Sequence, residues 1–289
     1  MEENKYVLNK LKNGSFDLII KINQKEITDA QRKIIEENKK HLELKGFRKG
    51  MAPDSKVKEE IGAEKLKELI LNFILPIIYQ EAIKKFNLHP IISPKIDLLS
   101  IKDGEDWEIK LISCEGPEIS LGHYKDEIKS KLSTKKIWTP SEGSEKPDEK
   151  TQNEEKEKRI EKILSWLIEN IKFEVSELLT EEEVNRKLSE LLEQTRKLGL
   201  TIDQYLSSTK KTVEDLRKEF SDQAERNLKM EFLLGKIADE ENITVNPSEV
   251  EEAISRTKDE KEKEAMNNNK YLIAIFIRQQ KALDFLTSL

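Results

Sequence analysis

The sequence predicts an α+β protein in two parts: a small N-terminal α+β domain with an antiparallel sheet, and an all-α C-terminal domain of long antiparallel helical arms. Before residue 117, short runs rich in β-branched residues alternate with helical patterns. Residues 117–158 are mostly polar, and after residue 159 apolar residues recur only at helical spacing. We therefore expect domains at 1–116 and 159–289, joined by a flexible linker at 117–158.

Four runs are expected to form the N-terminal sheet. They are 6–11, 15–22, 96–101 and 107–113. The second run, SFDLIIKI, is β-branched in its second half, and an Asn-Gly turn signal precedes it. Asp103-Gly104 lies between the last two runs and is a hairpin signal. Strands on both sides of a helical stretch favour one antiparallel sheet with the helices packed on it.

Three helices are expected between the second and third strands. Thr28 or Asp29 can cap the first, which runs to about His41. Pro53 then starts a short helix, because its fixed φ suits a first turn. A longer helix at 63–86 contains Pro76, which should kink it. Its apolar residues recur at helical spacing: Ile70, Phe73, Ile74, Ile77, Ile78 and Ala82.

The C-terminal half carries several apolar stripes at helical spacing. The first runs from Ile160 to Ile171, and the second from Val184 to Leu198, where Gly199 is a C-terminal cap. A long helix follows from Val213 to Ile237, an Asn-Pro pair precedes the next helix, and a last helix spans 272–286. These stripes predict long, thin antiparallel helix pairs.

Charge is concentrated in one part of the chain. Charged residues make up 37% of the chain and aromatic ones 6%, which predicts exposed helical surface and thin cores. The net charge is −6, yet residues 39–58 carry seven Lys or Arg against Glu43 and Asp54. A basic patch on an acidic protein predicts one localised acidic or phosphate-rich partner. The overall balance does not support a dedicated nucleic-acid-binding protein.

The centre of this basic patch is Gly46-Phe47-Arg48-Lys49-Gly50-Met51-Ala52-Pro53. Glycines on both sides permit the backbone conformations of a tight loop tip. Such a tip exposes a guanidinium, an ammonium and an aromatic ring, a set that suits docking on carboxylates or phosphates. It supplies no general base, nucleophile or metal ligand, so we interpret it as a docking element.

Catalytic, metal-binding and membrane functions find no support among the residues. Cys114 is the only cysteine, so it cannot form an internal disulfide, and we expect a buried thiol. The three histidines lie far apart, and there is no glycine-rich phosphate loop. The N-terminus lacks the apolar core of a signal peptide, and no apolar run could span a bilayer. We expect a cytoplasmic protein without metal or cofactor.

Several segments, in order along the chain, resemble trigger factor, a family of bacterial chaperones that receive nascent chains. The loop GFRKGMAP resembles the ribosome-docking signature of that family, and NLHPIISPKIDLLSI (87–101) resembles the end of its ribosome-binding domain. Three later segments are similar to its helical chaperone domain: 181–206, 215–245 and 279–286.

The chain also departs from the family pattern. Trigger factors usually carry a prolyl isomerase domain of the FK506-binding type between the two halves, where this chain has only residues 117–158. The resemblance therefore implies a variant without that domain and without enzyme activity. Met51 stands where the family signature usually has a lysine, and the C-terminal end looks short.

The resemblance implies an ATP-independent chaperone that binds nascent polypeptides at the ribosomal exit tunnel and delays their misfolding. The docking residues would be Lys45, Gly46, Phe47, Arg48, Lys49 and Gly50, which would meet protein and RNA of the large subunit. We also expect an apolar surface for unfolded clients. Its candidates are Tyr205, Met230, Phe232 and Phe276.

Two alternatives from other functional classes stay open. One is a ribosome-independent holdase or assembly factor, because the docking loop has one charge fewer than the family signature. The other is a peptidyl-prolyl isomerase, which would need a catalytic domain for which the sequence has no room. No membrane partner is expected, and a weak homodimer of the free chain is left open.

Overall fold

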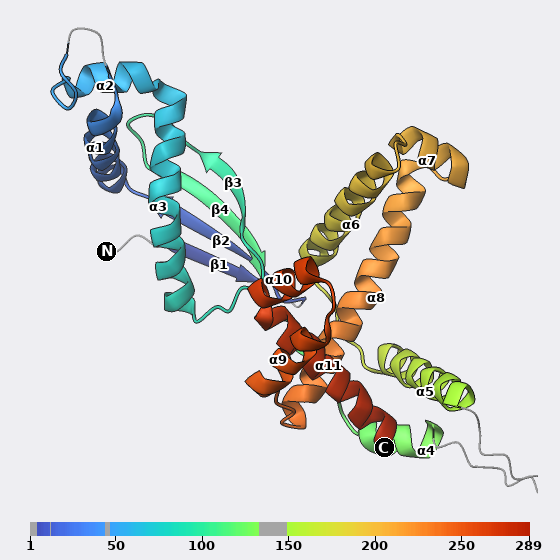
Figure 1. Cartoon of the computed structure of the whole chain (residues 1–289). Helices are drawn as coiled ribbons and strands as arrows, with labels where there is room; N and C mark the ends of the chain where they lie inside the picture. Colours follow the sequence, from blue (N-terminus) through green and yellow to red (C-terminus); the bar gives the residue numbers. More distant parts are fainter. Residues whose placement is uncertain (1–4, 12, 44–46, 133–148) are drawn as a thin grey trace, which may run out of the picture. The chain divides into compact units, whose positions relative to one another are not determined.

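The computed structural model describes residues 5–11, 13–43, 47–132 and 149–289, with side chains left out at 131–155 (Figure 1). The chain forms two compact units, Met1–Gly116 and Pro117–Leu289. The first holds an antiparallel sheet with helices, and the second has helices and connecting segments, with no strand among its described residues. This confirms the predicted fold class. No helix among the described residues is both long and apolar enough to cross a membrane.

The sheet of the first unit has four antiparallel strands in the order β1-β2-β4-β3. The strands are β1 (Tyr6–Lys10), β2 (Ser15–Ile22), β3 (Lys95–Ser100) and β4 (Trp107–Cys114). Leu18 of β2 pairs with Leu111 of β4, so their side chains share one face. The four predicted runs therefore all form strands, within one or two residues of their expected bounds.

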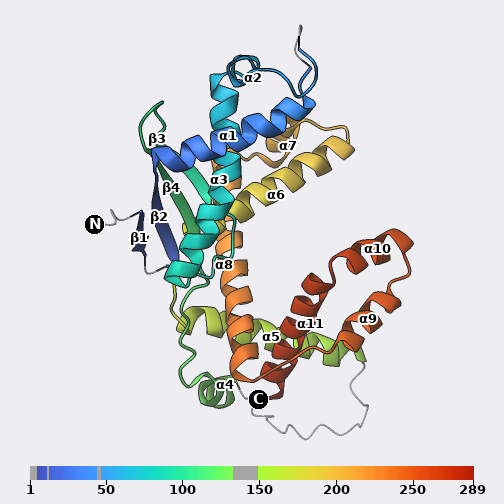
Figure 2. The same ribbon diagram turned by 90° about the vertical axis from the view of Figure 1, so that its left-hand side faces the viewer.

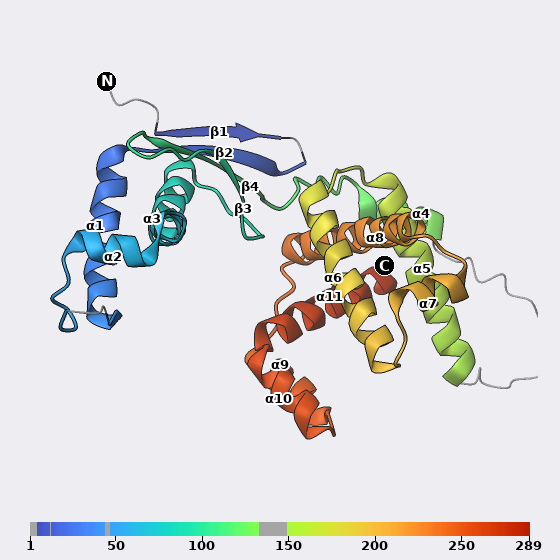
Figure 3. The ribbon, with the colours of Figure 1, turned by 90° about the horizontal axis from the view of Figure 1, so that it is seen from above.

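Three helices lie on the same side of the sheet (Figure 3). They are α1 (Gln24–His41), α2 (Asp54–Ile61) and α3 (Ala63–Phe86). The expected start of the first at Thr28 or Asp29 is wrong. Asn23 caps α1 through a capping box with Glu26, because the helix begins directly after β2. Helix α3 continues through Pro76, which is exposed.

The core of the first unit lies between the sheet and α1 and α3. Strand residues Phe16, Leu18, Ile20 and Ile22 are fully buried there, and α3 contributes Ile70, Ile74 and Ile78. This alternation along β2 places one strand face in the core, and the helical spacing along α3 supplies the opposing side. A smaller separate core consists of Ile35, Ala52 and Val57.

The second unit begins inside the predicted linker, which corrects that expectation. Helix α4 (Tyr124–Leu132) and helix α5 (Glu149–Asn170) both fall within or overlap 117–158. Leu121, Tyr124 and Ile128 are buried in the core of the second unit. The sequence of α4 is short and charged and does not indicate a core helix. Its two buried residues, Tyr124 and Ile128, contact segments that are distant in the sequence. Ile137 and Trp138 lie outside the described residues.

The remaining helices of the second unit are α6 (Glu177–Lys197), α7 (Ile202–Thr209), α8 (Val213–Glu240), α9 (Pro247–Arg256), α10 (Glu260–Asn268) and α11 (Lys270–Ser288). Helix α6 runs beside α8, with α7 at the end of the pair (Figures 1 and 2). Gly199 follows α6 with a φ of 73°, as expected for a C-terminal cap. The shared core of the unit is built from α4, α5, α8 and α11, and includes Leu167, Leu233, Ile237 and Leu286.

Candidate functional site

The predicted docking loop joins α1 to α2, and its base is anchored. Ala52 is 7% exposed and packs with Ile35 of α1 and Val57 of α2. Lys39 near the end of α1 forms an ion pair with Asp54, the first residue of α2. Two helices therefore hold the base of the loop, and residues 47–51 are exposed.

The tip of the loop is a tight turn. The Met51 N–H donates a hydrogen bond to the Arg48 carbonyl over 2.9 Å, and Gly50 has a φ of 85°. Residues with side chains rarely adopt this φ, so glycine suits the position. Phe47 is 42% exposed and Met51 75% exposed, which places two apolar side chains beside the cations. Lys45 and Gly46 lie outside the described residues.

The two cations of the tip are available to a partner. The Lys49 ammonium lies 3.8 Å from the exposed Glu43 carboxylate, a long contact that contributes little. In the part of the chain that the structure describes, Arg48 has no ion pair or hydrogen bond through its guanidinium. The tip therefore presents an unpaired fork of donors, a loosely held ammonium and apolar surface. It can bind anionic groups, and it offers no group for covalent or acid–base chemistry.

The four predicted client-binding residues do not form one surface. Phe276 of α11 is 67% exposed, whereas Met230 and Phe232 of α8 and Tyr205 of α7 are half-buried. Met230 packs against the core of the second unit. Phe232 and Ile275, the neighbour of Phe276, line one shallow pocket of about 290 Å³ between α8 and α11. The structure thus places Phe232 near the part of α11 that carries Phe276, whereas Tyr205 lies on α7 and does not line this pocket.

Sequence reasoning missed further exposed apolar residues in the second unit. Tyr271 and Leu272 stand 77% and 59% exposed at the start of α11, one turn before Phe276. Leu198, Leu200 and Val213 are exposed where α6, α7 and α8 meet. Leu198, Val213 and Leu272 stand at the ends of the predicted apolar stripes, and periodicity alone does not show that a stripe stops being buried at its ends.

Other candidate chemistry is absent from the described residues. Cys114 is buried at the end of β4, as expected. No group of three or more His, Cys, Asp or Glu among these residues could hold a metal ion.

Two family models match this chain. The model described as bacterial trigger factor protein (TF) matches residues 4–163, and the model of the bacterial trigger factor C-terminus matches residues 144–288. The chain belongs to the trigger factor family. Because the two matches overlap, they leave no room between them for a separate domain, which confirms a variant without the isomerase domain.

Curated trigger factors match part of the chain, and about a third of the residues in the aligned segment are identical. The trigger factor of Lactiplantibacillus plantarum is 36% identical over 110 residues, which is 38% of this chain and 25% of that protein. The trigger factor of Streptococcus uberis is 36% identical over 132 residues, 46% of this chain and 31% of that protein. The matches thus span between a quarter and a third of the length of these relatives.

A solved structure supports the fold over nearly the whole chain. Its description reads "Promiscuous Substrate Recognition in Folding and Assembly Activities of the Trigger Factor Chaperone". The similarity has a TM-score of 0.69 at 17% sequence identity, and it covers 98% of this chain and 99% of the other. At that identity the match shows the shared fold alone.

Proposed function

We propose that this trigger factor family member is an ATP-independent, ribosome-associated chaperone of the cytoplasm. The tip formed by Phe47, Arg48 and Lys49 docks at the rim of the exit tunnel, on protein and RNA of the large subunit. The helical second unit then shields emerging apolar segments and delays their misfolding. The observation that carries this proposal is the anchored loop with an exposed, unpaired Arg48 at its tip.

The tip chemistry fits an anionic docking surface. A guanidinium binds a carboxylate or phosphate through two parallel hydrogen bonds, and a charge-assisted hydrogen bond contributes about 1.5–3 kcal/mol. Burying the exposed part of Phe47 contributes about 1 kcal/mol more, since full burial of such a side chain contributes about 1.5–3 kcal/mol. These sums describe a weak tether, which suits a chaperone that must leave the nascent chain.

The second unit supplies the surface for unfolded segments. Tyr271, Leu272 and Phe276 present exposed apolar area along the first turns of α11, and Phe232 adds to the neighbouring pocket. Exposed apolar surface of this kind binds apolar segments of partner chains. Tethering at the tunnel raises the local concentration of such weak binding sites near their clients.

Ribosome co-sedimentation tests the docking. We expect the wild-type chain to pellet with ribosomes at low salt, and the Phe47→Ala/Arg48→Ala/Lys49→Ala variant to stay in the supernatant. Lys84→Ala, an exposed cation at the end of α3, is the matched control and should pellet like the wild type. Equal pelleting of all three proteins would contradict the docking.

The alternatives are separated by activity assays. A ribosome-independent holdase would suppress aggregation of an unfolded test protein equally in the wild type and the triple variant, and neither would pellet with ribosomes. The exposed Met51 at the tip favours this second candidate, because it adds no charge to the docking surface. We propose that the chain has no enzyme activity, so turnover of a proline test peptide above background would contradict this.

A further inference from the structure

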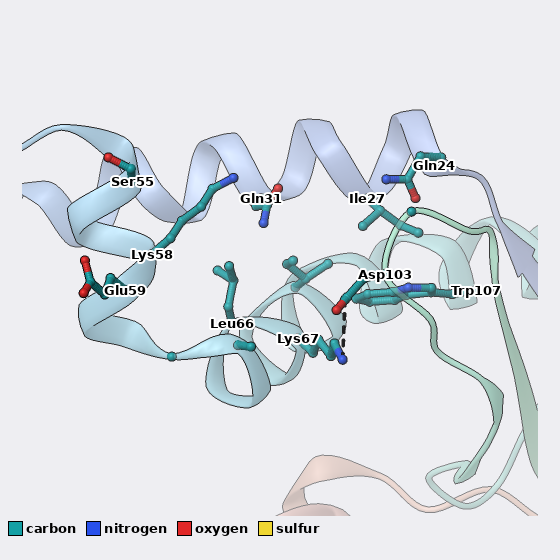
Figure 4. A pocket seen from close by; sticks show the side chains of 14 residues that line it. Gln24, Ile27, Gln31, Ser55, Lys58, Glu59, Leu66, Lys67, Asp103 and Trp107 are labelled. Carbon is teal, nitrogen blue, oxygen red and sulfur yellow. Dashed lines mark ion pairs between the residues drawn. The ribbon is translucent and has the colours of Figure 1, made fainter.

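A crevice in the first unit, separate from the docking tip, lies between α1, the corner of α2 and α3, and the turn that joins β3 to β4 (Figure 4). Its volume is about 620 Å³, within the range of ligand-binding pockets. The floor consists of buried apolar side chains from three elements. They are Ile27, Leu66, Ile70 and Trp107.

The α1 wall of the crevice carries two amide side chains, Gln24 and Gln31, with Ile27 between them (Figure 4). Gln24 and Gln31 are seven positions apart, about two helical turns, so they lie on one side of α1 and about 10 Å apart along its axis. Neither side-chain amide makes a hydrogen bond within the described part of the chain. Both therefore have free donors and acceptors beside an apolar floor.

The charges around the crevice leave one cation without a partner. Lys67 lies 3.4 Å from Asp103 across the mouth, as the dashed line in Figure 4 shows, and Glu59 pairs with Lys56 at 2.7 Å. Lys58, which extends along the crevice toward Gln31, has no ion pair among the described residues. The four charged side chains that line the crevice sum to zero, and Lys58 is the one among them without an oppositely charged group at ion-pair distance in the described part of the chain.

We propose that this crevice binds an extended stretch of an unfolded polypeptide in which an apolar residue neighbours an acidic one. An extended chain advances about 3.3 Å per residue, so three residues span the distance between the two glutamine amides. Gln24 and Gln31 bind peptide N–H and C=O groups, the apolar side chain enters the floor beside Trp107, and Lys58 pairs with the carboxylate. This peptide site goes beyond ribosome docking and uses none of the tip residues.

Fluorescence anisotropy with the full chain, without ribosomes, tests the site. The probes are two fluorescein-labelled peptides of glycine and serine that differ only in a central Leu-Glu or Leu-Lys pair. We expect the Leu-Glu peptide to bind about three- to tenfold more tightly than the Leu-Lys peptide. Lys58 forms a partly exposed ion pair with the glutamate of the first peptide, and it repels the lysine of the second. Lys58→Glu should abolish or reverse this preference, whereas Lys84→Glu, the same charge change elsewhere on the unit, should leave it unchanged.

A photoreactive leucine analogue in the Leu-Glu peptide locates the bound segment. Crosslinks to α1 or α3 around the crevice support the proposal. Crosslinks confined to residues 117–289, or equal affinity of the two peptides for the wild type, would overturn it. The Phe47→Ala/Arg48→Ala/Lys49→Ala variant should bind the peptide like the wild type, so a failure of ribosome docking leaves this result distinct.

Discussion

The Glu241 carboxylate, directly after α8, binds two residues of α4 in addition to the packing of α4 in the core. The Tyr124 hydroxyl donates to a Glu241 carboxylate oxygen over 2.9 Å, and the Lys125 ammonium lies 2.5 Å from the same oxygen. The Glu241 side chain is only 15% exposed. The hydrogen-bonded ammonium of Lys125 and the Tyr124 hydroxyl hold the pKa of Glu241 below its ordinary value of about 4.3. We therefore expect Glu241→Gln to loosen α4.

The magnitude follows from the exposure of each partner. A hydrogen bond to a charged, mostly buried carboxylate contributes about 1.5–3 kcal/mol. The Lys125 side chain is 43% exposed, so solvent screening limits its pair to at most about 1 kcal/mol. An amide in place of the carboxylate still accepts from Tyr124, so we expect Glu241→Gln to cost about 1–2 kcal/mol at neutral pH.

The pH dependence has a definite sign. Because the folded-state pKa of Glu241 is lowered, its contribution is fully present above the unfolded-state pKa and is lost as the pH falls through the folded-state pKa. The stability difference between wild type and Glu241→Gln should therefore shrink as the pH is lowered below about 4.3.

Hydrogen exchange of the α4 amides, read by mass spectrometry of the full chain, measures this local stability. We expect faster exchange in Glu241→Gln than in wild type at pH 7, with a matched change in Tyr124→Phe. Glu161→Gln, the same change at an exposed carboxylate of α5, is the control and should leave the exchange of the α4 amides like that of the wild type. Identical exchange in wild type and Glu241→Gln would refute the role of the carboxylate.

Three further predictions concern the docking tip, the second core and the client surface. Gly50→Val should weaken ribosome pelleting, because a φ of 85° strains a β-branched residue by about 1–2 kcal/mol and the tip changes its turn to relieve that strain; the thermal unfolding temperature should fall by only a few degrees. Leu233→Ala should destabilise the second unit by about 2–5 kcal/mol in urea unfolding, because Leu233 is 1% exposed in its core; a loss below about 1 kcal/mol would contradict that placement. Tyr271→Ser/Phe276→Ser should suppress aggregation of an unfolded test protein less well while melting unchanged, and undiminished suppression would move the client surface elsewhere.

Local patterns predicted most of the first unit. The β-branched run at 15–22 and the Asp103-Gly104 signal placed strands that the structure pairs through β4. The start of α1 was missed because Asn23 caps the helix directly after the last residue of β2. The capping box of Asn23 and Glu26 therefore follows the strand without a loop between them. Such errors arise at boundaries, where two local signals overlap.

The second unit shows where local patterns fail. Tyr124 and Ile128 are two apolar residues in a charged segment, and their burial depends on partners such as Glu241, far along the chain. The sequence likewise offered Tyr205 and Phe276 as candidates for the client surface, and it could not tell which of them is exposed. The crevice beside Trp107 needs four segments to meet, so only the assembled fold reveals it.

Site-specific crosslinking from the docking tip tests the central claim most directly. Phe47 is replaced by a photoreactive phenylalanine analogue, and the full chain is irradiated with translating ribosomes. The proposed docking predicts crosslinks from this position to large-subunit components at the exit tunnel, with none from the same probe at Lys84. Absence of ribosomal crosslinks from position 47, under conditions in which the chain co-sediments with ribosomes, would contradict it.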